Sequence, residues 1–306
     1  MWNILICTSS FDKKNLPNNK ILKSIKIKYN LFGRTLKENE LLKLIDEKTI
    51  GIISGTEKIS KKVINKGKNL QVISRCGTGT DNIDNSSLNR NIKIFKTDKE
   101  PITAVAEFVV TQILSVLKNS YLHNFYLKKK KWKKIKGKML TNNHIGLIGY
   151  GKIGKEIRSL LRPFKCKISI YDPNINKYSS IKNLNFILKN SKIITLNIPF
   201  NEKNKSFINF QKLKQMSEDA ILVNCSRGGL IDENALYDKL KKHKSFKAIL
   251  DCFDAEPYNG KLLKLDNVTV SPHIASFTKE TRDKMEQKSF INCLENINFK
   301  KLNEKD

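Results

Sequence analysis

Three polar residues follow short apolar stretches in the last third of the chain, and together they could reduce a ketone that carries a carboxylate. Arg227 lies in VNCSRGGLIDENAL, Glu256 in LDCFDAEP and His273 in VSPHIAS. The planar guanidinium of an arginine can hold the carboxylate and carbonyl oxygens of a 2-oxo acid. Imidazoles titrate near neutral pH, so His273 is the natural proton donor to the developing alkoxide. Glu256 could orient this imidazole through its other ring nitrogen.

A glycine-rich stretch upstream predicts a dinucleotide site. Residues 144–173, HIGLIGYGKIGKEIRSLLRPFKCKISIYDP, predict a strand, a glycine turn, a helix and a second strand. Gly149, Gly151 and Gly154 have the G-x-G-x-x-G spacing that lets a pyrophosphate sit at the helix N-terminus. Asp172 ends the second strand, where a carboxylate can accept hydrogen bonds from the adenosine ribose hydroxyls. Because an acid there repels a 2′-phosphate, the pattern favours NAD over NADP.

Strands and helices alternate along the chain, which predicts a parallel α/β architecture. Strands are expected at residues 3–7, 51–54, 70–75, 92–95, 145–148, 167–171, 192–197, 220–224, 247–250 and 268–270. Helices are expected at 35–47, at 279–298 and at 104–127, the last apolar enough to be well buried. An open parallel sheet presents its ligands at the carboxyl ends of its strands, where Arg227, Glu256 and His273 would lie.

The composition sets looser bounds on the function. A chain of 306 residues is long enough for two domains. Its net charge of +29 by itself would suggest a protein that binds polyanions, but lysine is spread through every segment and arginine is scarce. We therefore expect no specific nucleic-acid partner. The densest lysine cluster, residues 128–138, is expected to be a solvated connecting face.

The cysteines and the apolar segments indicate a reduced cytoplasmic protein. Six cysteines are scattered without C-x-x-C spacing, so neither a metal site nor a disulfide framework is expected. The N-terminal stretch MWNILICTSSFDKK has no basic leader, and no later apolar run reaches transmembrane length. No membrane association is expected.

With these motifs in this order, the chain resembles the D-isomer-specific 2-hydroxyacid dehydrogenase family, most closely its phosphoglycerate dehydrogenase-like branch. Two further motifs carry the resemblance, SRCGTGTDNID at residues 74–84 and TAVAEF at 103–108. The resemblance implies two open parallel-sheet domains, with a Rossmann NAD-binding domain, residues 99–276, inserted in a flavodoxin-like substrate domain, residues 1–98 plus 277–306. It also implies a homodimer made through the cofactor domains.

The resemblance assigns roles to individual positions. It makes Arg227 the substrate-binding arginine, His273 the acid/base and Glu256 its partner. The substrate carboxylate would be bound by the backbone N–H groups of one loop: Cys76, Gly77, Thr78 and Gly79. The cofactor would be contacted outside the three glycines by four residues: the amides of Lys152 and Ile153 at the pyrophosphate, and Asp251 with the backbone near Cys225 at the nicotinamide.

The substrate is less clear than the reaction. The resemblance favours interconversion of 3-phosphoglycerate and 3-phosphohydroxypyruvate, a step of serine biosynthesis, by a short form without a regulatory domain. Where that branch has an arginine after the second strand, however, this chain has Ser54-Gly55-Thr56-Glu57. A glycine–threonine turn could still bind phosphate through backbone N–H groups. Hydroxypyruvate, glyoxylate or a sugar-derived acid therefore remain alternatives.

A function from another class also remains open. The family that the chain resembles includes NAD-responsive transcriptional corepressors, and the positive charge would suit a binding role. The intact set of Arg227, Glu256 and His273 argues against a purely non-catalytic protein, and the sequence contains no DNA-reading motif. The sequence thus predicts an NAD-dependent oxidoreductase.

Overall fold

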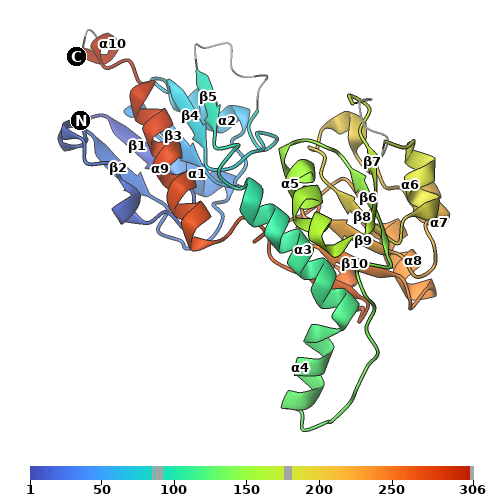
Figure 1. Ribbon diagram of the computed structural model, residues 1–306. Helices are drawn as coiled ribbons and strands as arrows, with labels where there is room; N and C mark the ends of the chain where they lie inside the picture. The colour runs from blue at the N-terminus through green and yellow to red at the C-terminus, as the bar shows by residue number, and fades with distance from the viewer. Residues whose placement is uncertain (85, 87–91, 176–180, 304–306) are drawn as a thin grey trace. The chain divides into compact units, whose positions relative to one another are not determined.

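The chain folds into two compact units, each with one open, fully parallel β-sheet (Figure 1). The computed structural model describes residues 1–84, 86, 92–175 and 181–303. Unit 1 consists of Met1–Pro101 and Thr278–Asp306, and unit 2 of Ile102–Phe277. The prediction of two parallel-sheet α/β domains is confirmed.

The sheet of unit 1 has the strand order β2-β1-β3-β4-β5. Its strands are β1 (Asn3–Ile6), β2 (Lys26–Tyr29), β3 (Thr49–Ser54), β4 (Val72–Arg75) and β5 (Lys93–Lys96). This is the flavodoxin-like order, whose switch point lies between β1 and β3. The edge strand β2 was not predicted, because its sequence KIKY places lysines at every second position and has only two apolar residues.

Helices cover both faces of this sheet. Helices α1 (Glu38–Leu44) and α2 (Lys61–Lys66) pack on one face through residues such as Leu41 and Ile64. Helix α9 (Lys279–Glu295) packs on the other through Met285 and Phe290, and Figure 1 shows it running across the sheet. Short helical turns η1 (Lys13–Asn15), η2 (Lys20–Ser24) and α10 (Lys300–Asn303) complete the described part of the unit.

The sheet of unit 2 has the strand order β11-β10-β9-β8-β6-β7. Its strands are β6 (His144–Ile148), β7 (Lys167–Tyr171), β8 (Ile193–Leu196), β9 (Ile221–Asn224), β10 (Lys247–Leu250) and β11 (Val268–Val270). All six were predicted from the sequence within one or two residues. They are short apolar runs bounded by turn residues, the pattern of a strand that is buried on both faces.

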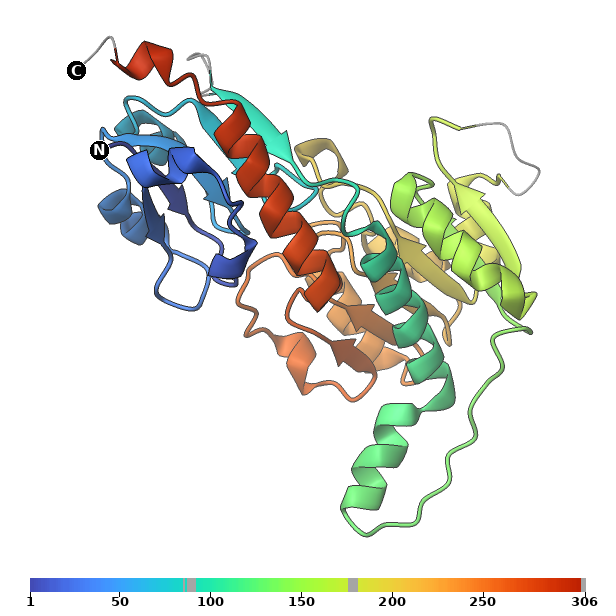
Figure 2. The same ribbon diagram turned by 60° about the vertical axis from the view of Figure 1, so that its left-hand side comes forward.

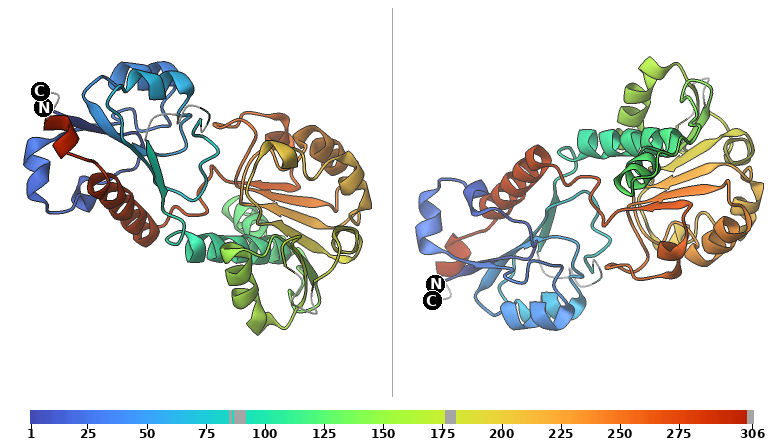
Figure 3. Two further views of the ribbon diagram at one scale, coloured as in Figure 1. Left: turned by 90° about the horizontal axis from the view of Figure 1, so that it is seen from above. Right: turned by 90° about the horizontal axis from the view of Figure 1, so that it is seen from below.

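Helices lie on both faces of this sheet, as the views in Figure 3 show, and each face has a hydrophobic core. Helices α3 (Ile102–Lys118) and α5 (Lys152–Leu161) cover one face. Helices α6 (Leu184–Asn190), α7 (Phe210–Gln215) and α8 (Glu233–Lys242) cover the other. Three 3-10 turns lie in the connections: η4 (Arg162–Phe164), η5 (Glu202–Asn204) and η6 (Lys261–Lys264).

The single buried helix predicted at residues 104–127 is wrong. The chain breaks at Asn119, which has a φ of 52°, so that α3 ends there and α4 (Ser120–Lys128) starts at an angle of 60°. Asparagine adopts this left-handed conformation more readily than most residues. None of the residues of α4 is buried, and Figure 2 shows α4 and the chain after it projecting beyond α3. The lysine cluster at 128–138 is exposed as predicted, apart from the half-buried Ile135.

No helix among the described residues is by itself long and apolar enough to cross a membrane. The bent pair of α3 and α4 meets the length and composition of a span only when the two are taken together. Of this pair, α3 has seven buried residues, and six of them belong to the core of unit 2.

Candidate active site and cofactor site

The three candidate catalytic residues follow neighbouring strands of unit 2 and meet at one edge of its sheet. Arg227 comes after β9, Glu256 after β10 and His273 after β11. The Nδ1 atom of His273 lies 2.9 Å from Oε2 and 3.1 Å from Oε1 of Glu256. Both side chains are about one-third exposed, 29% and 31%. This geometry leaves Nε2 of the imidazole unbound to Glu256.

The electrostatic environment keeps Glu256 ionised. Burial acts to raise the pKa of this carboxyl group, but the hydrogen bond and charge of His273 outweigh it. The backbone N–H of Phe253, 3.1 Å from Oε1, and the charge of Arg227 add to the effect, so the pKa of Glu256 is lowered. The influence of Arg227 on this pKa places its positive charge near the His273–Glu256 pair.

The turn of Arg227 packs directly against the turn that carries Glu256. A Cβ atom on Gly228 would overlap the carbonyl oxygen of Phe253, so only glycine allows this approach. The N–H of Gly229, which has a φ of 77°, donates to Asp254 over 2.5 Å. The pair of glycines after Arg227 therefore brings the arginine and glutamate motifs together.

A buried carboxylate holds the loop of His273. Asp251 is fully buried and accepts hydrogen bonds from Ser271 Oγ (2.5 Å), Ile274 N (2.9 Å) and Ala275 N (2.8 Å). These donors bracket His273, which has a φ of 55°. Burial raises the pKa of Asp251, and the three hydrogen bonds act against this rise. Both oxygens of Asp251 thus accept hydrogen bonds from this loop. The contact of Asp251 with a nicotinamide stays a prediction.

Two cysteines lie next to these groups. Cys225 and Cys252 are buried, and burial, followed by the charge of Asp251, raises the pKa of both thiols well above the usual value. The Cys252 sulfur, a Glu256 oxygen and a His273 nitrogen lie within 4.8 Å of one another. The position of Cys252 in this group was not predicted from the sequence, because no C-x-x-C or similar spacing marks it. A thiol, a carboxylate and an imidazole can ligate a divalent metal, although here the hydrogen bond already engages Nδ1.

The glycine motif adopts the geometry that a dinucleotide needs. Gly149 has a φ of 93°, and a Cβ there would lie 2.5 Å from the carbonyl oxygen of Asn197. A Cβ on Gly154 would overlap the carbonyl oxygen of Gly149. A Cβ on Gly151, by contrast, would meet no atom within 4 Å. The first and third glycines thus serve packing, whereas the second faces open space where a ligand can approach the backbone.

The remaining cofactor residues lie around this loop. Gly151 is the N-cap of α5 and supplies no side chain, so Lys152 and Ile153 begin a helix whose first N–H groups can bind an anion. Asp172, at the end of β7, accepts hydrogen bonds from Tyr150 N (2.8 Å) and Asn174 N (3.0 Å). The carboxylate is therefore held beside the glycine loop, and these residues suit a dinucleotide.

The candidate substrate loop, residues 76–79, lies in unit 1 and is folded by an arginine. The Arg75 guanidinium donates to the carbonyl oxygens of Cys76 (2.7 Å), Gly79 (3.1 Å) and Ser54 (3.4 Å). The N–H of Cys76 donates to Ser54 O over 2.9 Å, which extends the β3–β4 ladder. This corrects the prediction that the N–H of Cys76 binds the substrate, because this N–H already donates to Ser54 O. In the described part of the chain, the N–H groups of residues 77–79 donate no hydrogen bond.

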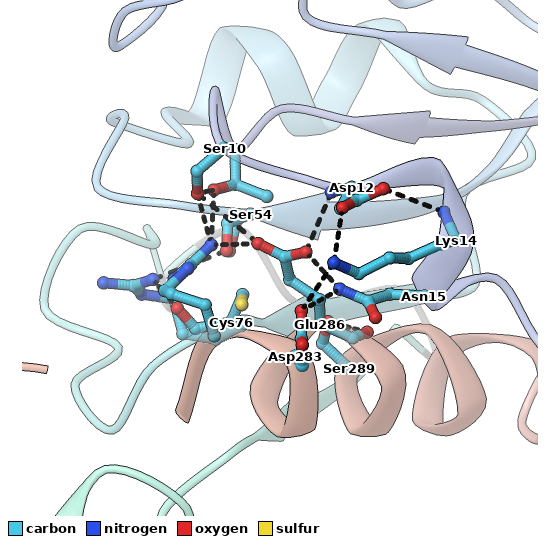
Figure 4. Close-up of polar contacts among 12 residues, drawn as sticks. Ser10, Asp12, Lys14, Asn15, Ser54, Cys76, Asp283, Glu286 and Ser289 are labelled. Carbon is cyan, nitrogen blue, oxygen red and sulfur yellow. Dashed lines mark hydrogen bonds and ion pairs between the residues drawn. The ribbon is translucent and has the colours of Figure 1, made fainter. Parts of the chain in front are cut away.

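A buried ion pair lies beside this loop and was not predicted from the sequence. Glu286 of α9 is 1% exposed and accepts hydrogen bonds from Arg282 (2.8 Å), the N–H of Asp12 (2.9 Å) and Asn15 Nδ2 (2.9 Å). Figure 4 shows this cluster between α9 and the chain that follows β1, with Ser54 and Cys76 next to it. The i, i+4 spacing of Arg282 and Glu286 was visible in the sequence, but such pairs are usually on the surface.

Comparison with known proteins agrees with this geometry. The model of the D-isomer specific 2-hydroxyacid dehydrogenase, NAD binding domain, matches residues 110–275. Over 257 residues the chain is 35% identical to the hydroxypyruvate reductase of Thermotoga maritima. The aligned region covers 81% of this chain and 84% of that protein. The chain belongs to the D-isomer specific 2-hydroxyacid dehydrogenase family. As a member of this family it is an NAD-dependent oxidoreductase.

Other relatives of this 2-hydroxyacid dehydrogenase carry different names. The chain is 34% identical to the D-3-phosphoglycerate dehydrogenase of Methanocaldococcus jannaschii over 81% of its length, but it spans only 49% of that protein. The crystal structure of the TT0316 protein from Thermus thermophilus superposes with a TM-score of 0.85 at 26% identity, over 95% of this chain and 96% of that chain. The family is thus clear, while the names of the relatives point to more than one acid.

Proposed function

We propose that this dehydrogenase reversibly reduces a small 2-oxo acid to the D-2-hydroxy acid, with Arg227, Glu256 and His273 as its catalytic groups. The observation that carries the proposal is the 2.9 Å contact between His273 Nδ1 and Glu256 Oε2. With Nδ1 turned toward the carboxylate, Nε2 can deliver a proton to the substrate oxygen. Glu256 holds the ring in place and stabilises the imidazolium that exists before the transfer.

Two groups would bind the acid. The guanidinium of Arg227 can form a bidentate contact with the carboxylate and the 2-oxo oxygen, which lowers the energy of the charge that develops on that oxygen. The family resemblance assigns the N–H groups of Gly77, Thr78 and Gly79 to the same carboxylate. These three donors have no partner within the described residues, so binding would not break an existing hydrogen bond.

The cofactor supplies the hydride for reduction when it is bound. The N-terminus of α5 and the open space at Gly151 would receive its pyrophosphate. Asp172 would bind the adenosine ribose and repel a 2′-phosphate. Because its carboxylate is held by two backbone N–H groups, it should discriminate strongly between NADH and NADPH.

The test is NADH oxidation by the purified protein with 3-phosphohydroxypyruvate, which the sequence favoured, and with hydroxypyruvate, glyoxylate and a sugar-derived 2-oxo acid. We expect His273→Ala to lower kcat by at least about 100-fold while NADH still binds with its wild-type Kd. Full activity in this variant would exclude His273 as the proton donor. Absence of turnover by the wild-type protein with every acid would reject the proposed function.

We also propose that the chain forms a homodimer through α4 and the segment that follows it. This arm exposes large apolar side chains: Tyr121 (69%), Leu127 (56%) and Trp132 (80%). Apolar side chains that cluster on a surface, as Tyr121 does by stacking on Phe125, are typical of an interface. Because residues 128–138 are rich in lysine, salt should strengthen the dimer by screening their repulsion. Sedimentation of the wild-type protein and of a Tyr121→Glu, Leu127→Glu variant tests this, and a wild-type monomer at micromolar concentration would overturn it.

Six free cysteines, five of them buried, further suggest that the enzyme works in a reducing, cytoplasmic compartment. Measuring kcat before and after treatment with a mild oxidant would test this suggestion, with loss of activity expected. An enzyme that keeps its activity and forms disulfides would contradict it.

A further inference from the structure

The end of strand β3 in unit 1 carries a carboxyl group at the place where a sheet of this order receives ligands. The order β2-β1-β3-β4-β5 puts the switch point between β1 and β3, where the chain leaves the two strands toward opposite sides. Thr8 follows β1, and the turn of Gly55, Thr56 and Glu57 follows β3. A Cβ on Gly55 would lie 3.2 Å from Thr8 Cα, so the two chain segments are in direct contact there.

This turn and the candidate substrate loop form one framework. The side chain of Asn82 donates to the carbonyl oxygens of Gly55 (3.1 Å) and Glu57 (2.7 Å). Ile59 and Ile83 are joined by a parallel bridge just beyond it. Arg75 also joins the two, because its guanidinium donates to Gly79 O in the loop and to Ser54 O at the end of β3. An acid whose carboxylate is bound by residues 77–79 would therefore have its far end near this turn.

Glu57 itself occupies the anion position of the turn. Its Oε1 atom accepts the N–H of Gly55 over 2.5 Å, and its Oε2 atom would lie 2.8 Å from a Cβ on Gly55. The residue is 2% exposed. The backbone donor that could have bound a phosphate oxygen is therefore already used by a carboxyl group of the protein.

The pKa values around the turn agree with this placement. Burial raises the pKa of Glu57, and the charge of Arg75 and the Gly55 N–H offset only part of that rise. The pKa of Cys7, at the end of β1, is raised by burial and then by the charge of Glu57. Burial already makes this carboxyl group costly to ionise, and a second anion beside it would increase that cost.

Both arginines near this turn are already engaged by groups of the protein, whereas the next residue along the chain, Lys58, is exposed. Arg75 donates to three carbonyl oxygens, and Arg282 is paired with the buried Glu286. Arg75, Arg282 and Glu286 all affect the pKa of Cys76, which places them around the substrate loop. The loop therefore has two arginines and two carboxyl groups, Glu57 and Glu286, in its surroundings. Ser54, labelled in Figure 4, offers only a buried hydroxyl without a hydrogen-bond partner.

We propose that Glu57 is a specificity residue that excludes phosphorylated acids, so that the substrate is a two- or three-carbon 2-oxo acid with an uncharged far end. The inference rests on the proposed function, because it needs the substrate carboxylate on residues 77–79. A phosphate at the far end would meet the carboxyl group of Glu57, and juxtaposed like charges oppose binding. Hydroxypyruvate and glyoxylate have the required chemistry, and 3-phosphohydroxypyruvate does not.

The first experiment compares kcat/KM of the wild-type enzyme for hydroxypyruvate and 3-phosphohydroxypyruvate, which differ only in the phosphate. We expect hydroxypyruvate to be preferred at least about tenfold, which corresponds to about 1.4 kcal/mol. A preference for the phosphorylated acid, or equal values, would overturn the proposal.

The second experiment changes the charge alone. Glu57→Gln keeps the size of the side chain, and we expect it to lower the preference for hydroxypyruvate at least fivefold, through a lower KM for the phosphorylated acid. Glu47→Gln is the matched control, because it removes one surface carboxylate of the same unit that is paired with Lys68. We expect the control to leave the ratio of the two kcat/KM values unchanged. An unchanged ratio in Glu57→Gln would refute the role of Glu57.

A binding measurement separates failure of this inference from failure of the proposed function, and it also serves if Glu57→Gln does not fold. Calorimetry of the wild-type protein with NAD⁺ would compare D-glycerate with 3-phospho-D-glycerate. Weaker binding of the phosphorylated acid supports the role of Glu57 even if no acid is turned over. Tighter binding of the phosphorylated acid contradicts it whatever the catalytic result.

Discussion

The Nδ1 atom of His273 lies 2.9 Å from Oε2 and 3.1 Å from Oε1 of Glu256, so one carboxylate sets the orientation of the imidazole. The two residues are 17 positions apart and follow neighbouring strands, β10 and β11. Because Glu256 is held ionised by His273 and by the charge of Arg227, its effect on the ring persists through the neutral pH range.

Replacing Glu256 by glutamine should lower kcat by about 100-fold with little change in the Kd of NADH. The amide cannot stabilise the protonated imidazole as a carboxylate does. Since the pKa of Glu256 is lowered, the wild-type carboxylate should lose its effect only as the pH falls below about 4.5, its ordinary range. Rates from pH 3.5 to 9 test this. Glu218→Gln, which alters a 3.4 Å contact with His243, is the control and should keep full activity.

Replacing Asp251 by asparagine should disturb the loop of His273. The wild-type carboxylate accepts three hydrogen bonds, whereas an amide has one oxygen and would turn its NH₂ toward a donor. We expect a loss of about 1–3 kcal/mol in stability and a fall in kcat. Thermal unfolding and steady-state kinetics measure the two effects. Ser271→Ala removes only one of the three donors and should have the smaller effect. Wild-type kcat in Asp251→Asn would show that the loop does not depend on this carboxylate.

Alanine at two glycines of the cofactor loop should have opposite consequences. Gly151→Ala adds a methyl group in open space, so the protein should unfold at the wild-type Tm but bind NADH at least about tenfold more weakly. Gly154→Ala places the methyl group against the carbonyl oxygen of Gly149 and should lower the Tm. Fluorescence titration with NADH and thermal unfolding distinguish the two variants. Unchanged NADH affinity in Gly151→Ala would mean that the pyrophosphate binds elsewhere.

Neutralising Asp172 should relax the choice of cofactor. Asp172→Asn can still accept the N–H of Tyr150 through its remaining oxygen. The N–H of Asn174 loses its acceptor, but this residue is exposed and its N–H can bind water instead, so the loop should keep its shape. With the negative charge gone, we expect the ratio of kcat/KM for NADH over NADPH to fall at least about tenfold. If the ratio stays the same, Asp172 does not select the cofactor.

The stability of the protein in acid should depend on Asp46. This carboxylate binds Lys28 (2.7 Å), Asn3 (2.9 Å) and Thr49 (3.0 Å); burial acts to raise its pKa, but these bonds lower it to about 2. A group with a lowered folded-state pKa stabilises the protein above its ordinary pKa near 3.8, and this contribution is lost as the pH falls toward about 2. Urea midpoints at pH 5 and pH 2.5 should differ less in Asp46→Asn than in the wild-type protein. Equal differences would show that Asp46 is not responsible.

The sequence was most informative where function depends on local patterns. The strands of unit 2 are short apolar runs, and each catalytic candidate directly follows one of them, so their meeting at one edge could be expected from parallel topology alone. The glycine motif was equally clear, because its spacing reflects the local geometry of one turn. Gly149 and Gly154 indeed make close backbone approaches, and Gly151 faces open space.

Long-range contacts limited the rest of the prediction. Periodicity alone continues across Asn119, so the break between α3 and α4 and the exposure of α4 could not be seen in the apolar pattern. The N–H of Cys76 was expected to bind the substrate. The pairing of β3 with β4 instead directs this N–H to the carbonyl oxygen of Ser54. The role of Asp251 in holding the loop of His273 likewise depends on contacts more than 20 residues away.

The sequence by itself determined the family, the parallel architecture and the set of reactive groups, since these follow from residue types, order and local spacing. Only the tertiary structure decided the surroundings of the substrate loop. Glu57 is two residues from the amide it occupies, yet its turn packs against Thr8 and the charge of Arg75 acts on it. Glu286 reaches the same edge from a helix more than 200 positions later. Charge balance in a buried site is a sum over groups that are distant in sequence, and no local pattern contains it.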